Sequence, residues 1–316
     1  MGWSGKQIVV TGAGGFVGSH LVERLLAEGA QVRGLVQGNA GYLTGLEADG
    51  LKVVVGDLLD RGCLAGLMDG ADCVFHLGAI TSVAYSYAHP VETVEVNVMG
   101  TVNVLEAARV AGVGRFVHTS TAGVYGSAEG GKPISESHPV SACNPYTAAK
   151  LGADNVVETY FRSYDFPVTT LRLFNTYGPR MGQYLILPTI VEQLMVGPEL
   201  RLGDLRPTRP FTYVDDIVEA YLRMGVTEGV LGEVIHVGAE EDISMLALVE
   251  RVSSIMEQPY ALVEDASRLR PANSEIFRVC VDNSKARRLL GWSPGVGLEA
   301  GLRSTVDWIK GGGYGI

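Results

Sequence analysis

Long apolar runs, paired cysteines and blocks of like charge are all missing from this chain of 316 residues. No apolar segment approaches the ~18 residues that a membrane-spanning helix needs, so we expect no membrane partner. Met1–Lys6 leads straight into a strand pattern, so no secretory leader is expected. The four cysteines form no CxxC pair, which favours reduced thiols in a cytoplasmic protein. No histidine, cysteine and carboxylate cluster has metal-ligand spacing, and we expect no metal site.

A basic block is equally missing. The net charge is −10 and the acidic residues are dispersed along the chain. Because nucleic acids and anionic membranes are bound through clustered lysine and arginine, neither is expected as a partner. Hydrophobic residues make up 47% and charged residues 19%, which indicates a globular core rather than disorder.

What the first half does contain is an alternation of short β-branched runs with helical patterns. Helices are predicted over Gly18–Glu28, Val94–Ala111 and Pro145–Tyr164. Strands alternating with helices indicate βαβ units, so the fold class is α/β, a Rossmann-type doubly wound parallel sheet. The predicted strands are Ile8–Val10, Gln31–Val36, Lys52–Val55, Cys73–Leu77, Arg115–Thr119 and Val168–Phe174.

The rhythm changes after Phe174, where proline and glycine punctuate Gly178–Pro210. We predict a dinucleotide-binding domain over residues 1–175, with 211–238 returning to it, and a smaller substrate-binding lobe from 176–210 and 239–316. The elements predicted in this half are strands over Arg209–Val214 and Val234–Gly238 and helices over Asp215–Met224, Ser244–Met256 and Ser284–Leu290.

The turn after the first strand is rich in glycine and reads Thr11-Gly12-Ala13-Gly14-Gly15-Phe16-Val17-Gly18. Gly12 allows a tight turn, Gly15 lets the backbone approach a pyrophosphate, and Gly18 lets the helix pack closely. The backbone at Phe16 and Val17 opens the helix, whose N-terminus attracts an anion. A strand before this motif and a helix after it indicate dinucleotide binding.

The second strand ends without the carboxylate that usually binds the adenosine ribose, because Val36 holds its place. Gln37 or Asn39 could bond a ribose hydroxyl instead. Since no lysine or arginine lies between Gln37 and Leu51 to receive a 2′-phosphate, NAD is favoured over NADP. Asp57 and Leu58 follow the third strand, where Asp57 either meets the adenine or caps a turn.

Tyr146 and Lys150 form a YxxxK pair behind Pro145 at a predicted helix start. Positions i and i+4 share one helix face. A nearby ammonium and a positive nicotinamide ring would favour the phenolate and make Tyr146 a base near neutrality. Upstream, the strand end Thr119–Gly126 offers hydroxyls that can bond a reacting sugar oxygen.

Together with Asn97, Arg172–Arg180, Arg209–Asp216 and Leu290–Trp292, these motifs resemble the extended short-chain dehydrogenase/reductase family, specifically its nucleotide-sugar epimerases and dehydratases. The resemblance implies NAD as cofactor and a nucleotide-diphosphate sugar as substrate. It implies the following roles: Tyr146 as general base, Lys150 as its partner and ribose ligand, Thr121 on the reacting hydroxyl, Leu77, Ala79 and Thr119 along the cofactor, and Thr81, Asn175, Arg209 and Arg270 on the substrate.

Two further positions of the motifs stay open. Asn97 is either a site residue or a buried amide that bridges backbone groups. Arg180 is either a site residue or a surface charge. In the family, helices such as Val94–Ala111 and Pro145–Tyr164 pair across a two-fold axis, so a homodimer is expected, the alternative being that both are internal.

The sequence departs from the family at one point of chemical consequence. Leu269–Glu275 and Pro207–Arg209 look like hexose and N-acetylhexosamine 4,6-dehydratases, which carry acidic residues just after the catalytic threonine. Here Ala122 and Gly123 stand there. General acid–base catalysis contributes about 10²–10⁴-fold, so the loss of both acidic residues should suppress the elimination of water. We therefore favour a 4-epimerase that oxidises C4 and returns the hydride to the other face. The alternatives are a 4,6-dehydratase, a 4-ketoreductase and a non-catalytic cofactor-binding protein.

Overall fold

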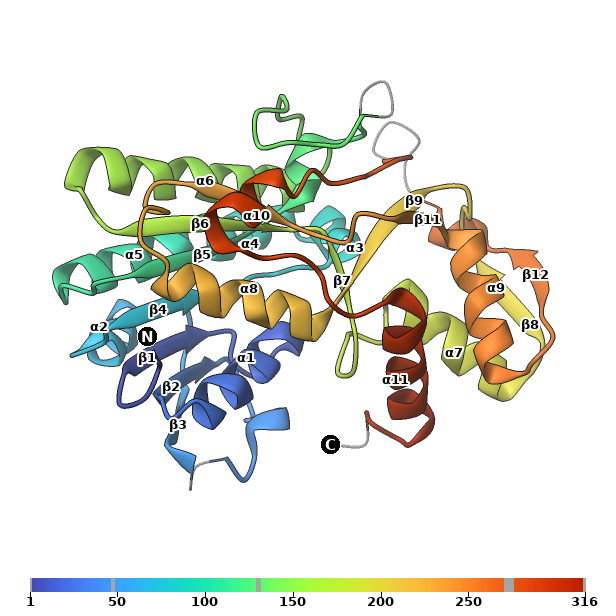
Figure 1. The fold of residues 1–316 in the computed structure, drawn as a ribbon, viewed down its shortest axis with the longest axis horizontal. Helices are drawn as coiled ribbons and strands as arrows, with labels where there is room; N and C mark the ends of the chain where they lie inside the picture. The colour runs from blue at the N-terminus through green and yellow to red at the C-terminus, as the bar shows by residue number, and fades with distance from the viewer. Residues whose placement is uncertain (1, 47–48, 129–131, 270–275, 315–316) are drawn as a thin grey trace.

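The computed structural model describes residues 2–46, 49–128, 132–269 and 276–314, and a seven-stranded parallel sheet forms its larger part (Figure 1). Each strand pairs in parallel with its neighbours. In spatial order the strands are β10 (Val234–Val237), β6 (Val168–Leu173), β5 (Phe116–Thr121), β4 (Cys73–His76), β1 (Gln7–Thr11), β2 (Gln31–Val36) and β3 (Leu51–Val55).

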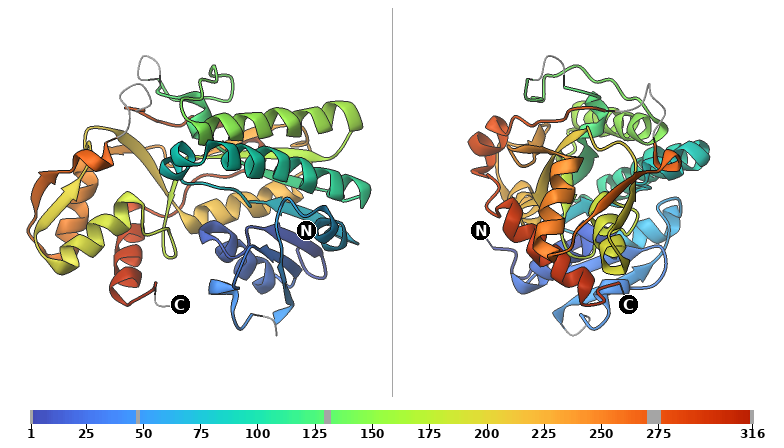
Figure 2. Two further views of the ribbon diagram at one scale, coloured as in Figure 1. Left: turned by 180° about the vertical axis from the view of Figure 1, so that it is seen from behind. Right: turned by 90° about the vertical axis from the view of Figure 1, so that its right-hand side faces the viewer.

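Helices cover both faces of this sheet because successive strand residues point to opposite sides. In β1, Ile8 and Val10 enter one apolar core and Val9 enters the other. On the first face lie α1 (Phe16–Ala27), α8 (Val214–Val226) and α10 (Ser284–Leu290). The second face carries α2 (Arg61–Met68), α5 (Gly100–Val110) and α6 (Pro145–Tyr164), and Figure 2 shows α5 and α6 side by side. Before α5 come α3 (Val83–Ala88), α4 (Pro90–Val94) and a π-helical segment, Glu95–Met99.

The second lobe lies beyond one end of this sheet (Figure 1). It contains α7 (Ile186–Val196), α9 (Met245–Met256) and α11 (Leu298–Lys310), which pack on one another. One small sheet has the order β11 (Asp242–Ser244), β9 (Thr208–Tyr213), β7 (Asn175–Tyr177), and a second pairs β12 (Ala261–Glu264) with β8 (Glu199–Leu202). Single 3₁₀ turns cover Gly41–Leu43, Ala122–Tyr125 and Ala266–Arg268.

The predicted fold class is confirmed, and β2, α6 and α10 have the predicted bounds. The strand predicted over Arg209–Val214 is present as β9 but belongs to the small sheet, whereas β10 returns to the large one. The helix predicted over Val94–Ala111 is present within an unbroken helical run, in which α4 continues through the π-helical segment into α5. The division into two domains stays a prediction.

Two general features of the chain bear on its environment. Among the residues that the structure describes, no helix combines the length and apolar character needed to cross a bilayer. Those residues also bring no three His, Cys, Asp or Glu side chains together in a way that would hold a metal ion. All four cysteines are free thiols.

Candidate active site

The glycine-rich turn joins β1 to α1, and its glycines are required by close packing. Gly12 has a φ of 68°, and a Cβ there would lie 2.8 Å from the Gly78 nitrogen. A Cβ on Gly18 would lie 2.2 Å from the Gly12 oxygen. Within α1, which the structure describes throughout, no side chain caps the N-terminus at Gly15 and no acidic residue lies in the first turn. The positive end of the helix therefore fits the phosphate of a dinucleotide.

Two of the predicted ribose and adenine contacts meet at the ends of β2 and β3. The Gln37 Nε2 donates to Asp57 Oδ2 at 3.0 Å, while Asp57 Oδ1 accepts from the Leu59 N–H at 2.8 Å. Asp57 thus caps its turn, which was one of the two roles considered for it, and it also orients Gln37. Leu58 is buried beside this turn and Asn39 is exposed. Their contacts with a cofactor stay predictions.

The end of β4 is fixed by a chain of buried hydrogen bonds. His76 lies between two hydroxyls, with Nδ1 2.7 Å from Thr11 Oγ1 and Nε2 3.0 Å from Thr101 Oγ1. The Gly78 N–H donates to the same Thr11 oxygen at 3.1 Å. Because Thr101 gives its own proton to the Asn97 carbonyl, His76 donates from Nε2 and accepts at Nδ1. This chain places the backbone at Leu77 and Ala79 beside the phosphate turn.

Of the two roles considered for Asn97, the structure shows the bridge between backbone groups. Its Oδ1 accepts from the Ile80 N–H at 2.8 Å and its Nδ2 donates to the Ile80 carbonyl at 2.9 Å. The side chain is 1% exposed, so these bonds satisfy an amide that would otherwise be costly to bury. Asn97 therefore anchors the loop that carries Ala79 and Thr81.

The helix α6 presents Tyr146 and Lys150 from a well-capped start. Asn144 accepts from the Thr147 N–H at 2.9 Å, and Thr147 Oγ1 accepts from the Asn144 N–H at 3.3 Å, a capping box. Pro145 fits at the first helical position because no intrahelical bond is needed there. Tyr146 therefore lies in the first turn and Lys150 one turn later, 4% exposed.

The electrostatics at Tyr146 describe the protein alone. Burial raises the pKa of Tyr146 to about 12, although a hydrogen bond with Thr121 acts in the opposite direction. Burial also lowers the pKa of Lys150 to about 8, against the charge of Asp154, which raises it. In the protein alone, desolvation of the phenolate therefore outweighs the favourable contacts. The prediction that Lys150 and the nicotinamide ring together make Tyr146 a base near neutrality stays a prediction.

The end of β5 sends its hydroxyls in different directions. Thr121 Oγ1 accepts from the Gly123 N–H at 3.2 Å, which leaves its own proton free to donate toward Tyr146. Thr119 Oγ1 lies 2.6 Å from the Tyr221 hydroxyl of α8. Tyr221 was not predicted as part of this region, because only the packing of α8 on β5 brings it there. Its charge would act on Tyr146 only if ionised, and burial raises its pKa.

The predicted substrate ligands lie on the small sheet. In the pairing of β7 with β9, Asn175 stands opposite Phe211. Arg209 is two residues before Phe211, so Arg209 and Asn175 project on the same face of the small sheet. The Arg209 Nη1 donates to the Thr208 carbonyl at 2.8 Å. Arg270 lies outside the described residues.

Tyr184 connects the two lobes. Its hydroxyl is 3.4 Å from Thr81 Oγ1, and it also lies close enough to influence the pKa of Tyr146. It borders a cavity of about 740 Å³. The cavity is lined by Gln183, Tyr184, Thr189, Glu192, Gln193, Val196, Gly197, Pro198, Glu199, Arg201 and Arg268.

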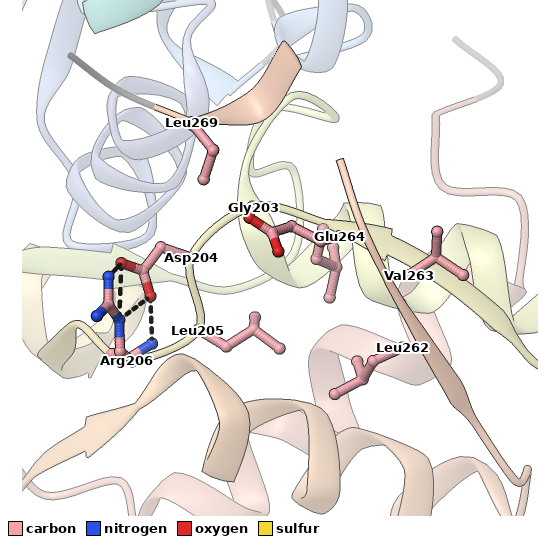
Figure 3. A pocket seen from close by; sticks show the side chains of 9 residues that line it. Gly203, Asp204, Leu205, Arg206, Leu262, Val263, Glu264 and Leu269 are labelled. Atoms are coloured by element: carbon pink, nitrogen blue, oxygen red, sulfur yellow. Dashed lines mark hydrogen bonds and ion pairs between the residues drawn. The ribbon is translucent and has the colours of Figure 1, made fainter. Parts of the chain in front are cut away.

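A second cavity, of about 470 Å³, lies deeper in the second lobe between β8 and β12. Figure 3 shows Leu205, Leu262 and Leu269 around it and the paired side chains of Asp204 and Arg206 at one side. None of the residues that line either cavity comes from β5 or α6, so neither cavity holds the reacting hydroxyl itself.

Arg180 is not a surface charge, since its side chain is only 18% exposed. Its Nη2 donates to Glu23 Oε1 on α1 at 2.7 Å, and its guanidinium lies 5.1 Å from the centre of the Tyr42 ring. It therefore connects the segment after β7 to α1 and to the turn after β2.

The match to known proteins covers nearly the whole chain. Residues 9–305 match the family described as GDP-mannose 4,6 dehydratase, and the chain belongs to this family of extended short-chain dehydrogenases/reductases. Over 315 residues it is 35% identical to the UDP-glucose 4-epimerase of Mycolicibacterium smegmatis, with 96% of this chain and 98% of the relative covered.

Solved structures give the same result. The dTDP-glucose 4,6-dehydratase of Streptomyces venezuelae, solved with NAD bound, is 33% identical with a TM-score of 0.89, covering 96% of this chain and 97% of that one. The UDP-glucuronic acid 4-epimerase of Bacillus cereus, in complex with UDP-glucuronic acid and NAD, is 31% identical with a TM-score of 0.90, covering 96% and 99%. The resemblance inferred from the motifs is confirmed.

Proposed function

We propose that this protein is an NAD-dependent nucleotide-sugar 4-epimerase. The observation that carries the proposal is the surroundings of the two residues after Thr121. Gly123 has no side chain, and a Cβ there would lie 2.7 Å from the Thr147 Cγ2 methyl, so an acidic side chain would require Thr147 to move. Ala122 is 5% exposed and packs in an apolar cluster with Val124 and Ile134. Neither position can supply a proton.

Elimination of water from a 4-keto sugar needs a base for one proton and an acid for the leaving hydroxyl. The carboxylate on the catalytic helix, Asp154, is buried and already bound by Ser120 and Arg172. Epimerisation needs neither group, since it uses the same base and the same hydroxyl ligand in both directions. The residues present therefore support inversion at C4 rather than dehydration.

In this mechanism Tyr146 takes the proton of the C4 hydroxyl and later returns it. Thr121 hydrogen-bonds the same oxygen, and Lys150 holds the nicotinamide ribose and supplies positive charge near Tyr146. NAD, which the two solved relatives bind, provides the hydride acceptor and a positively charged ring when bound. Because the protein alone keeps the pKa of Tyr146 at about 12, the base becomes competent only with the cofactor in place.

The cofactor site follows from the residues already described. The phosphates fit the N-terminus of α1 at Gly15, Phe16 and Val17, and the adenosine ribose fits the Gln37–Asp57 pair. No lysine or arginine lies between Gln37 and Leu51, and Arg180, whose guanidinium lies over the Tyr42 ring in the turn after β2, is paired with Glu23. This supports NAD over NADP.

The substrate is a nucleotide-diphosphate sugar. Asn175 and Arg209, on one face of the small sheet, would bind the diphosphate. The cavity beside Tyr184 would hold the nucleotide, with Arg201 and Arg268 in its wall. In this arrangement the sugar reaches Tyr146 and Thr121 past Thr81.

The first test is an assay with UDP-, GDP-, CDP- and dTDP-linked hexoses, hexosamines and hexuronates, with products identified by NMR and mass spectrometry. We expect a product of unchanged mass with inverted configuration at C4. A product lighter by one water would favour the second candidate, a 4,6-dehydratase, which the likeness to the Streptomyces enzyme supports. A Tyr146→Phe variant serves as the inactive control.

We further infer a homodimer in the cytoplasm. An apolar stripe over α4 and the π-helical segment is exposed, with Val91 78%, Val94 46% and Met99 44% accessible. Exposed apolar stripes of this kind favour a partner, and a two-fold axis lets the same stripe cover itself. The free thiols are consistent with a reducing compartment.

A further inference from the structure

A strip of polar side chains runs across the large sheet beneath α6. Parallel sheets that are covered on both faces ordinarily carry aliphatic residues there. In this sheet His76 of β4 stands opposite His118 of β5, and Ser120 of β5, Arg172 of β6 and His236 of β10 form a second row across three strands. All five are buried. Burying so many polar groups is costly unless they are hydrogen-bonded or paired, and each of the five has such a partner.

Asp154 of α6 is the centre of this strip. Its Oδ2 accepts from Ser120 Oγ at 2.8 Å and from Arg172 Nε and Nη2 at 3.0 and 2.8 Å. Its Oδ1 lies 3.2 Å from His118 Nε2. The carboxylate is therefore bound from two strands and is 6% exposed. It follows Lys150 by one helical turn and Tyr146 by two, so all three lie on one face of α6.

The protonation states around Asp154 leave few charges in the strip. Burial lowers the pKa of His118 to about 4 and that of His236 to about 3, and it holds the pKa of His76 well below its usual range. The titratable groups that interact with Lys150 or Tyr146 from the packed elements are His76, His118, Asp154, Tyr184 and Tyr221. At neutral pH only Lys150, Asp154 and Arg172 are charged.

We propose that Asp154 is a positioning residue of the active site, a fixed buried anion that keeps Lys150 in its ammonium form and sets the charge that Tyr146 experiences. Arg172, Ser120 and His118 hold the carboxylate in place. The proposal deepens the proposed function, because it concerns the same base. It also explains why Arg172, a costly residue to bury, stands on a central strand.

The sign of the effect follows from the charge of Asp154. A negative charge disfavours loss of the ammonium proton and also disfavours the phenolate, so it raises the pKa of both Lys150 and Tyr146. Replacing it by the neutral isostere in Asp154→Asn should lower both. At the distances of neighbouring helical turns the titration of each group should move by about 1–2 pH units toward acid.

The test is an ultraviolet titration of the tyrosinate signal in the NAD-loaded protein, with the signal of Tyr146→Phe subtracted. For Asp154→Asn we expect the midpoint of the Tyr146 titration to fall by about 1–2 pH units. Ser120→Ala removes a neutral hydrogen bond to the same oxygen and should leave the midpoint in place. Asp154→Glu keeps the charge and should restore it. An unchanged or raised midpoint in folded Asp154→Asn would overturn the proposal.

Lys150 provides a second readout. The upper limit of the pH range in which NAD binds, measured by titration calorimetry, should also move toward acid in Asp154→Asn. Should this variant fail to fold, Asp154→Ser also removes the carboxylate while leaving a hydroxyl oxygen, and the tyrosinate midpoint should fall likewise. Neither measurement needs a sugar. If the wild type epimerises no nucleotide sugar, the proposed function fails, whereas the role of Asp154 is decided by these titrations.

Discussion

At the scale of single residues, the buried histidines of the sheet domain show how neighbouring groups fix a protonation state. His236 Nδ1 lies 3.1 Å from the Ile134 carbonyl, so it carries the proton, and Nε2 accepts from the Tyr125 hydroxyl at 2.8 Å. His76 is likewise bound on both nitrogens in its neutral form. A proton added to either ring would have no acceptor and no solvent, which is why their pKa values are depressed.

This predicts a loss of stability in mild acid. The unfolded chain protonates these histidines near pH 6.5, whereas folded His118 titrates at about 4 and His236 at about 3. Their contribution is therefore complete above pH 6.5 and is lost as the pH falls toward 4. Each neutral histidine contributes up to about 1.4 kcal/mol per pH unit in that window.

Urea unfolding at about pH 7 and about pH 5 should thus differ by about 3 kcal/mol or more in the free energy of unfolding. His118→Gln should reduce this difference, whereas His89→Gln, at an exposed position, should not. Equal free energies of unfolding at the two pH values would contradict the assignment of neutral buried histidines.

Some residues of the candidate site can be predicted from nearby sequence patterns, and others cannot. The sequence predicts that Tyr146 and Lys150 share one helix face, because the i, i+4 spacing fixes it. Thr121 is predictable because it stands at the end of a strand that the sequence pattern indicates. Asp154 has the same spacing from Lys150 and could have been found in that way. Tyr221 could not, because it reaches the site only through the packing of α8 on β5.

At the scale of elements, most of the parallel sheet was predictable because its strands are apolar and its helices long. Two missed helices have identifiable reasons. Pro188 is a residue that interrupts helices, but it lies in the first turn of α7, where its missing N–H costs nothing. Gly301 weakens the helical pattern of α11, but a Cβ there would lie 2.1 Å from the Tyr177 hydroxyl. In α11 tertiary packing therefore outweighs local propensity.

The turn between β1 and α1 gives an element-scale prediction. Gly18→Ala would drive a Cβ into the Gly12 oxygen, so it should lower the free energy of unfolding by about 1–3 kcal/mol and weaken NAD binding. The matched control is Gly66→Ala in α2, where a Cβ meets nothing within 4 Å. That variant should gain up to about 1 kcal/mol from helix propensity. Thermal unfolding and NAD titration of both variants provide the measurement, and equal behaviour would contradict the packing argument.

At the scale of the whole molecule, the chain passes repeatedly between the two lobes, and the C-terminal segment joins them again. The Trp292 Nε1 donates to the Asp216 carbonyl at 2.8 Å, and the Asp216 carboxylate accepts from the Gly295 and Val296 N–H groups. Because α10 lies on the sheet and α11 in the second lobe, this segment connects both (Figure 1). Sequence patterns predict two lobes, but they do not predict these long-range contacts, which no local signal encodes.

The exposed stripe of α4 gives a prediction at this scale. In a two-fold dimer Val91→Glu would bury a charge from each subunit, so it should weaken dimerisation by at least about 10²-fold, measured by sedimentation equilibrium. Val55→Glu changes another exposed valine, 66% accessible on β3, and should leave the dimer intact. A wild-type protein that sediments as a monomer would contradict the proposed homodimer.

The position of β10 at the edge of the sheet has a consequence for protein synthesis. The ribosome completes β6 well before Val234–Val237, and it makes α7, β8, β9 and α8 in between. During that interval the nascent chain presents β6 as an open edge, whose free backbone groups can pair with another chain. A chain released before Val234 keeps that edge permanently. The last strand of the sheet thus covers the open side of β6 and leaves only its own four residues at that edge.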